Sequence, residues 1–185
     1  SEILNELVPC GAGRFCVVYP PLPAVFSMPF VMLGQHPGLA QSVASAVAGG
    51  LTATPMYLAI RAVGAPRRTA LIVCAFGMFG TTLFFTAAEG RAWYAAHAAG
   101  VFACSWAVYA ALTGRHPAIV GALLGCATLA RVPLVGASFG LIWLLMRSRD
   151  ASLPRVVMLF ALGAPPFGVA EIAYNFARWG SPFER

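Results

Sequence analysis

Charged residues are scarce in this 185-residue chain, and lysine is missing altogether. Only 10% of the residues are charged and 59% are hydrophobic, whereas an ordinary soluble domain carries about 25% charged residues. Twelve arginines and six acidic residues are too few to cover the surface of a soluble fold of this size. The composition therefore excludes an ordinary soluble domain and predicts an integral membrane protein.

The sequence also lacks the short motifs that carry common chemistries. It contains no nucleophile motif, no Gly-rich phosphate loop and no metal-ligand spacing, and its arginines form no dense cluster of the kind that binds nucleic acid. No metal site and no nucleic-acid partner is therefore predicted, although a divalent cation stays open as a cofactor. Cys10 and Cys16 share a loop, where they either pair in an oxidising compartment or stay unpaired.

Apolar runs of the length that crosses a bilayer fill the rest of the chain. A spanning helix needs about 20 mostly apolar residues, and prolines break the charge-free stretch between 15 and 60. We expect an outer loop over 1–22, a short juxtamembrane helix over 23–34 and a second outer loop over 175–185. The expected membrane helices cover 41–60, 69–88, 92–113, 117–130, 133–146 and 153–174. The predicted fold is all-α: a polytopic transmembrane bundle of about six spanning helices plus the short juxtamembrane helix.

The positions of the arginines predict the orientation of this bundle. Cytoplasmic turns of membrane proteins are enriched in basic residues. Successive turns of the predicted bundle lie on opposite sides of the membrane, and the turns on one side hold seven arginines, at 61, 67, 68, 115, 147, 149 and 155. Arg115 and Arg147 can share a side only if the segment 117–146 crosses twice. This places Arg131 at the opposite interface, and we expect a multi-pass protein of the bacterial inner (plasma) membrane.

Two pairs of glycines are candidates for close helix contacts. Gly121 and Gly125 lie one helical turn apart, and so do Gly136 and Gly140. Small residues at this spacing let two helix backbones approach closely in a membrane. We expect both pairs to lie at helix interfaces.

On this topology, polar residues from four separate segments gather on the outer face. They are Arg14 to Pro21, then Glu89 with Arg91, Trp93, Tyr94 and His97, then Arg131, and finally Glu171 with Tyr174, Asn175 and Arg178. Arginine offers a planar fork that suits phosphate, and ionisable groups near membrane depth are functional candidates. We therefore predict substrate-binding roles for Tyr19, Arg91, His97 and Arg131.

Each of these residues also has a structural interpretation, which stays open at this point. His97 could be satisfied by a neighbouring helix, and Arg91 could be an interfacial anchor or a partner of Glu89. Arg131 could extend to the headgroups, and Trp93 could belong to the aromatic belt at the membrane surface. The residues alone leave two classes: an enzyme that acts on a lipid-borne substrate, and a transporter or non-catalytic structural subunit of a membrane complex.

Four motifs in order resemble those of the GT-C type membrane glycosyltransferases, the group that includes protein O-mannosyltransferases and aminoarabinose transferases (glycosyltransferase family 39-like). They are YPPLP at 19–23, QSVASAVAGGLT at 41–52 followed by YLAIR at 57–61, ATLARVP at 127–133, and YNFARWGSPFE at 174–184. The resemblance covers nearly the whole chain. It implies transfer of a sugar, with inversion, from a polyprenyl-phosphate donor to a lipid, glycan or protein acceptor on the outer face.

The resemblance also implies a carboxylate as general base and cationic groups that stabilise the leaving lipid phosphate. Arg131 matches the family's basic position near that phosphate. The family's acid belongs in the first outer loop, upstream of the Pro-Pro step, where this chain has only Glu2 and Glu6. We expect the catalytic Asp to lie upstream of Ser1, the chain to be a fragment, and the fragment alone to be inactive as a transferase.

Overall fold

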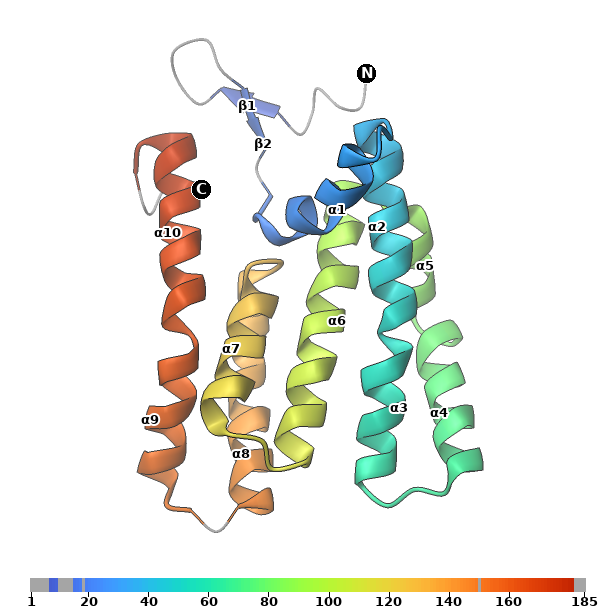
Figure 1. Cartoon of the computed structure of the whole chain (residues 1–185), viewed down its shortest axis with the longest axis vertical. Helices are drawn as coiled ribbons and strands as arrows, with labels where there is room; N and C mark the ends of the chain where they lie inside the picture. Colours follow the sequence, from blue (N-terminus) through green and yellow to red (C-terminus); the bar gives the residue numbers. More distant parts are fainter. Residues whose placement is uncertain (1–6, 10–14, 18, 150, 182–185) are drawn as a thin grey trace.

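The computed structural model describes residues 7–9, 15–17, 19–149 and 151–181, and it shows a bundle of helices that run along one long axis (Figure 1). The expected helical bundle is confirmed for this part of the chain. We call the end that carries the start of α2 and the end of α10 the upper end. The lower end carries the turns between α3 and α4, α6 and α7, and α8 and α9.

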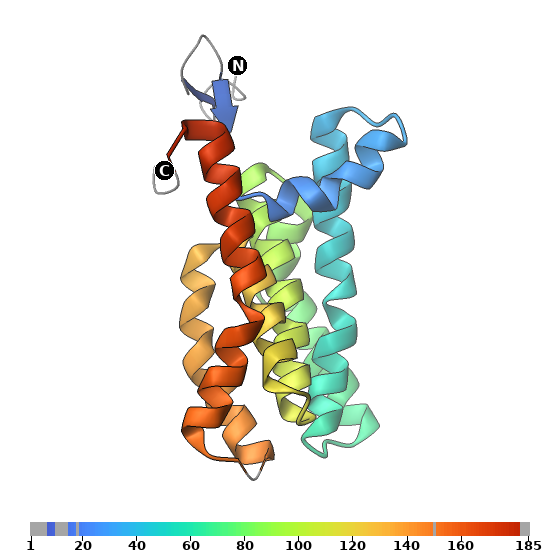
Figure 2. The ribbon, with the colours of Figure 1, turned by 60° about the vertical axis from the view of Figure 1, so that its left-hand side comes forward.

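A short hairpin and a transverse helix form the first part of the upper end. Strands β1 (Leu7–Pro9) and β2 (Phe15–Val17) pair antiparallel, inside the range 1–22 that was expected as a loop. Cys10 lies outside the described residues. Helix α1 (Leu22–Met32) follows and crosses the bundle axis (Figure 2). It is fixed there because the Leu22 amide donates to the Leu129 carbonyl, 3.1 Å away.

The next two segments run down and up again. Helices α2 (Pro37–Leu51) and α3 (Ala53–Ala62) form one continuous stretch, which begins where the His36 side chain accepts from the Gly38 amide. Helices α4 (Arg67–Phe79) and α5 (Thr82–Glu89) cover the range 69–88, where one helix was expected. That expectation is wrong, because the two helices are bent by 54°. The Thr81 hydroxyl accepts from the Leu83 amide and so starts a new helix at the bend.

The longest single helix, α6 (Ala92–Leu112), has almost the same limits as the expected range 92–113. It leads through the lower end into a hairpin of α7 (Pro117–Thr128), the 3₁₀ helix η2 (Val132–Ala137) and α8 (Ser138–Ser148). At about 1.5 Å per residue, α6 is about 32 Å long and α7 only about 18 Å. The turn between α7 and η2 therefore lies well below the upper end of α6 (Figure 1).

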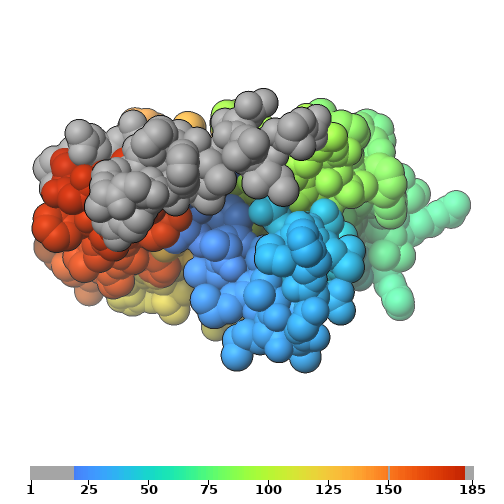
Figure 3. All heavy atoms as spheres, turned by 90° about the horizontal axis from the view of Figure 1, so that it is seen from above, coloured from blue at the N-terminus to red at the C-terminus, as the bar shows by residue number. Residues whose placement is uncertain are grey.

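The last stretch consists of α9 (Leu153–Gly163) and α10 (Pro165–Trp179). A loop was expected from residue 175 onward, but helix α10 continues through Trp179. It ends at Gly180, whose φ of 72° lies in the left-handed region that favours glycine. Seen from above, α10 lies at one end of an elongated bundle, and α4 with α5 lies at the other (Figure 3).

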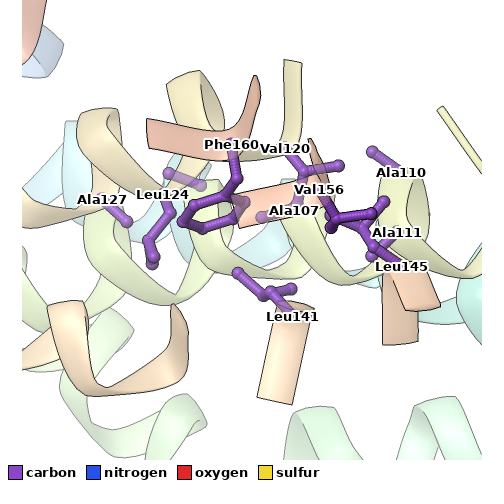
Figure 4. Packing of buried hydrophobic residues seen from close by; sticks show 11 residues of the cluster. Ala107, Ala110, Ala111, Val120, Leu124, Ala127, Leu141, Leu145, Val156 and Phe160 are labelled. Atoms are coloured by element: carbon purple, nitrogen blue, oxygen red, sulfur yellow. The ribbon is translucent and has the colours of Figure 1, made fainter. Parts of the chain in front are cut away.

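Small residues allow the helices of the core to pack closely. Buried alanines of α6 face α7 and α8, and Val120, Leu124, Leu141 and Phe160 fill the space between helices α7, α8 and α9 (Figure 4). An added Cβ at Gly121 would overlap the Phe160 carbonyl, so α7 and α9 meet backbone to backbone.

The expectation for the glycine pairs is met by one pair and not by the other. A Cβ at Gly125 would contact the Phe167 ring, just as one at Gly121 would contact Phe160. A Cβ at Gly136 or Gly140 would meet no atom of the described chain within 4 Å. The prediction that Gly136 and Gly140 lie at a helix interface within this chain is therefore wrong.

Three stretches in the described residues are long and apolar enough to cross a membrane: Pro37–Ala62, Ala92–Leu112 and Leu153–Trp179. The bent pair α4 and α5 makes a fourth if it counts as one span, and α1, α7 and η2–α8 are shorter apolar segments. Large apolar side chains are exposed on the outside of the bundle, including Phe76 at 69% and Phe139 at 81%.

Candidate functional site

A cavity of about 230 Å³, lined by charged, amide and aromatic side chains, lies near the upper end, between α6, the turn from α7 into η2, and α10. The residues that line it come from four separate segments: Tyr19 and Pro20; Trp93 and Ala96; Ala130 to Pro133; and Glu171, Asn175, Arg178 and Trp179. One cavity therefore brings together residues from all four segments that the sequence predicts to converge, Arg131 among them.

Arg131 is held by two residues on one side of α6. The chain is extended at Arg131, with φ of −153° and ψ of 114°, as it leaves the α7 turn and enters η2. The guanidinium carbon Cζ lies 4.1 Å from the centroid of the Trp93 ring, a cation–π geometry. Its Nη1 also contacts the His97 imidazole, with 3.1 Å to Nδ1. Because arginine only donates, the ring nitrogen that binds it is the acceptor.

His97 and Trp93 lie one helical turn apart on α6, so their side chains share a face. Their ring centroids are 6.1 Å apart with the planes tilted by 66°. His97 is half-buried and contacts Arg131. This contact matches the structural interpretation of His97, in which a neighbouring segment supplies its polar partner. It therefore positions Arg131 and does not line the cavity.

Tyr19 joins the first segment to both walls of the cavity. Its backbone carbonyl accepts from Tyr174 Oη and from Arg178 Nη1, each at 3.2 Å. Its ring meets the edge of Trp93, with the centroids 6.4 Å apart. Pro20 restricts the backbone of Tyr19 to the extended region, and Pro21 already has helical angles, with φ of −74° and ψ of −24°, where α1 begins.

The α10 wall consists of residues spaced at one helical turn. Glu171, Asn175 and Arg178 follow the i, i+4, i+7 spacing and share one face. Asn175 is only 6% exposed. Arg178 lies over two rings, with its Cζ 4.6 Å from the Tyr174 centroid and 5.1 Å from that of Trp179. A second arginine therefore faces the cavity that contains Arg131.

Arg91 is a predicted site residue that the structure places away from the cavity. Its Nε lies 2.7 Å from Glu89 Oε1, and its side chain is 62% exposed. The pair flanks Gly90, whose φ of 62° makes the turn and whose carbonyl accepts from Gln41 Nε2 at 3.0 Å. The ion pair with Glu89 is the structural interpretation that the sequence left open for Arg91.

Two residues of the site were assigned other roles, or none, from the sequence. For Trp93 the sequence left membership of the aromatic belt open, and in the structure its ring is the platform for Arg131. Trp179 was expected in a loop, but it belongs to α10 and lines the cavity. The spacing of Trp93 and His97 on one helix face was the signal for the first. The continuous helical pattern up to Gly180 was the signal for the second.

No group of three or more His, Cys, Asp or Glu residues suited to a metal ion occurs in the described ranges. The groups that the cavity offers to a ligand are two guanidinium groups, several aromatic rings, one amide and one carboxylate. No known protein family, curated protein or solved structure matches the chain in sequence or structure comparisons.

Proposed function

We propose that the chain is embedded in a bacterial cell membrane and crosses it six times, with the upper end on the outer side. The three long apolar stretches, the bent pair α4–α5 and the two arms of the α7–η2–α8 hairpin supply the crossings. Exposed Phe76 and Phe139 favour contact with lipid over water. The lower end carries seven arginines, at 61, 67, 68, 115, 147, 149 and 155, and basic turns favour the cytoplasmic side.

Within that membrane, the chain is proposed to form part of a glycosyltransferase that uses a polyprenyl-phosphate sugar as donor. One observation carries this proposal: Arg131 and Arg178, from distant parts of the chain, line the same cavity together with aromatic rings. Arginines bind phosphate through charge-assisted hydrogen bonds, and aromatic faces suit the apolar faces of sugar rings. Such a cavity suits the phosphate and sugar of a ligand whose hydrocarbon chain lies in the lipid beside the bundle.

The chemistry assigned to the arginines is stabilisation of a leaving phosphate. In the transfer, an acceptor hydroxyl gives its proton to the carboxylate base that the resemblance implies and attacks the anomeric carbon, while the bond from that carbon to the phosphate oxygen breaks. The electron pair stays on the phosphate oxygen, and a fixed guanidinium nearby lowers the energy of that charge. Arg131 suits this role because Trp93 and His97 fix its orientation before any ligand binds.

The proposal is tested by measuring donor binding. The full chain is reconstituted in nanodiscs and titrated with a fluorescent polyprenyl-phosphate sugar. Saturable binding is expected, and Arg131→Ala should raise the Kd about tenfold or more, because a charged hydrogen bond to phosphate is lost. Arg68→Ala, which removes the same charge from the lower end, should change the Kd less than about twofold.

The rival class, a transporter or non-catalytic subunit, makes a different prediction. A structural subunit binds no donor, so the absence of saturable binding would count against the proposal. A transporter would move the donor without cleaving it. Sugar transfer by the complete gene product, measured as labelled sugar on an added acceptor, separates the enzyme from both.

A further inference from the structure

A second polar cavity, of about 460 Å³, lies at the lower end of the bundle, remote from the proposed donor site. Its walls are the turn between α6 and α7, the end of α8 and the start of α9. Its lining includes two arginines, Arg149 and Arg155, and one histidine, His116. A volume of this size lies within the range of small-molecule sites, about 300–1,000 Å³.

One wall of this cavity is fixed by hydrogen bonds. Arg149 Nη1 donates to the Gly114 carbonyl at 2.9 Å and to the Arg115 carbonyl at 3.1 Å. Ser148 Oγ donates to the Ala111 carbonyl at 3.0 Å. The end of α8 is therefore held against the end of α6. Because a guanidinium has five N–H donors, these bonds through Nη1 leave donors on Arg149 for a ligand.

The opposite wall is the first turn of α9. Arg155 is exposed at the rim, whereas Val156 is 1% exposed and belongs to the core. Farther along α9, this helix is in close contact with α7, because a Cβ added at Gly163 would overlap the Ala118 carbonyl. Arg155 therefore stands on a helix that packs against α7, and Arg149, which directly follows α8, is bound to the turn before α7 by its two hydrogen bonds. This arrangement favours a formed site over a flexible charged surface.

The charge around the cavity is strongly positive. The sequence of the turns at the lower end holds seven arginines and one acidic residue, Asp150. An arginine at a fixed position recognises phosphate oxygens better than a mobile one, since less entropy is lost on binding. We propose that this cavity binds a phosphate group, supplied either by the headgroup of an anionic phospholipid or by a soluble phosphate ester.

This inference uses a different end of the molecule from the proposed function, and it holds whether or not the chain transfers sugar. The two sources of phosphate share the same recognition chemistry. In the first arm of the test, the full chain is placed in phosphatidylcholine nanodiscs with increasing phosphatidylglycerol, and retained lipid is counted by native mass spectrometry. In the second arm, the same chain is titrated with glycerol phosphate and followed by ³¹P line broadening.

Saturable binding in either arm supports the proposal and identifies the source. In that arm Arg155→Ala should weaken binding about tenfold, and Ala151→Phe, which fills the cavity without removing a charge, should weaken it similarly. Arg67→Ala is the matched control, because it removes an exposed arginine of the same end outside the cavity. Its effect should stay within about twofold.

Two results would overturn the proposal. One is the absence of saturable binding in both arms. The other is an equal loss for Arg67→Ala and Arg155→Ala together with no effect of Ala151→Phe, since that pattern belongs to a diffuse surface charge and not to a cavity. Because Arg155 is exposed and stands outside the core, its substitution is expected to leave the fold intact, which circular dichroism of both variants checks.

Discussion

The Arg131 guanidinium lies over the Trp93 indole, with 4.1 Å between its Cζ and the ring centroid. This contact joins the turn after α7 to the first turn of α6, and His97 holds the same guanidinium from one helical turn below. A cation stacked on a ring keeps its charge available to an anion, whereas one paired with a carboxylate is largely neutralised. The site therefore presents Arg131 as an oriented positive charge.

Replacement of Arg131 by lysine tests the importance of that orientation. Lys keeps the charge but loses the planar fork that stacks on Trp93 and reaches phosphate with two hydrogen bonds. Arg131→Lys is expected to raise the Kd for a polyprenyl-phosphate sugar about tenfold, as a lost charge-assisted hydrogen bond would. Fluorescence titration in nanodiscs measures this. Arg68→Lys at the lower end is the control, and a Kd for Arg131→Lys equal to that of the wild type would show that charge alone suffices.

The apolar runs of the sequence predict the helices well because a bilayer-length run admits few alternatives. Helix α6 matches its expected range closely, and the hairpin of α7 and α8 follows from the requirement that Arg115 and Arg147 share a side. The bend between α4 and α5 was missed, because hydrophobicity does not distinguish a straight helix from two bent ones. The Thr81 cap beside Gly80 was the local signal.

The candidate site was predictable as a gathering of segments but not as a set of contacts. Parity of crossings placed Tyr19, Arg131 and the α10 residues at one end, and the structure brings them around one cavity. The residue pattern alone could not predict that Arg91 pairs with Glu89 or that Arg178, and not Arg91, lines the cavity. Such a choice depends on side-chain reach within about 3 Å, which residue spacing does not determine.

The close contact between α7 and α9 predicts that one added methyl group lowers the stability of the bundle. Gly121→Ala would place a Cβ against the Phe160 carbonyl, and overpacking of this kind costs about 1–3 kcal/mol. Gly140→Ala meets no described atom within 4 Å, and alanine is favoured over glycine in a helix by up to about 1 kcal/mol. Thermal unfolding in one detergent should therefore show a lower midpoint for Gly121→Ala and an unchanged or higher one for Gly140→Ala. Equal midpoints for the two variants would contradict this packing.

The proposed orientation predicts which loops are reached from outside the cell. Arg91 and Arg115 are both exposed, the first near the upper end and the second at the lower end. In intact cells, a membrane-impermeant thiol reagent should label Arg91→Cys and leave Arg115→Cys unlabelled until the membrane is opened. The background is a chain in which serine replaces Cys10 and Cys16, because its remaining cysteines, Cys74, Cys104 and Cys126, are buried or half-buried. Labelling of Arg115→Cys alone would reverse the orientation.

Arg178 has two roles to be separated: a proposed contact with the donor phosphate and a hydrogen bond to the Tyr19 carbonyl. A second variant of the chain separates them. Its Nη1 donates to the Tyr19 carbonyl, and so does Tyr174 Oη, but of these two side chains only that of Arg178 lines the cavity. Arg178→Gln removes the charge and the bond, whereas Tyr174→Phe removes one comparable bond and keeps the charge.

If Arg178 acts on the donor phosphate, Arg178→Gln should raise the Kd about tenfold and Tyr174→Phe less than about twofold, since a charged contact to phosphate is worth more than one neutral hydrogen bond. If its role is to hold Tyr19 in place, the two variants should weaken donor binding to the same extent and lower the unfolding midpoint equally. Titration and thermal unfolding of both variants distinguish these outcomes. The first pattern is expected, because Tyr19 keeps its ring contact with Trp93 in either variant.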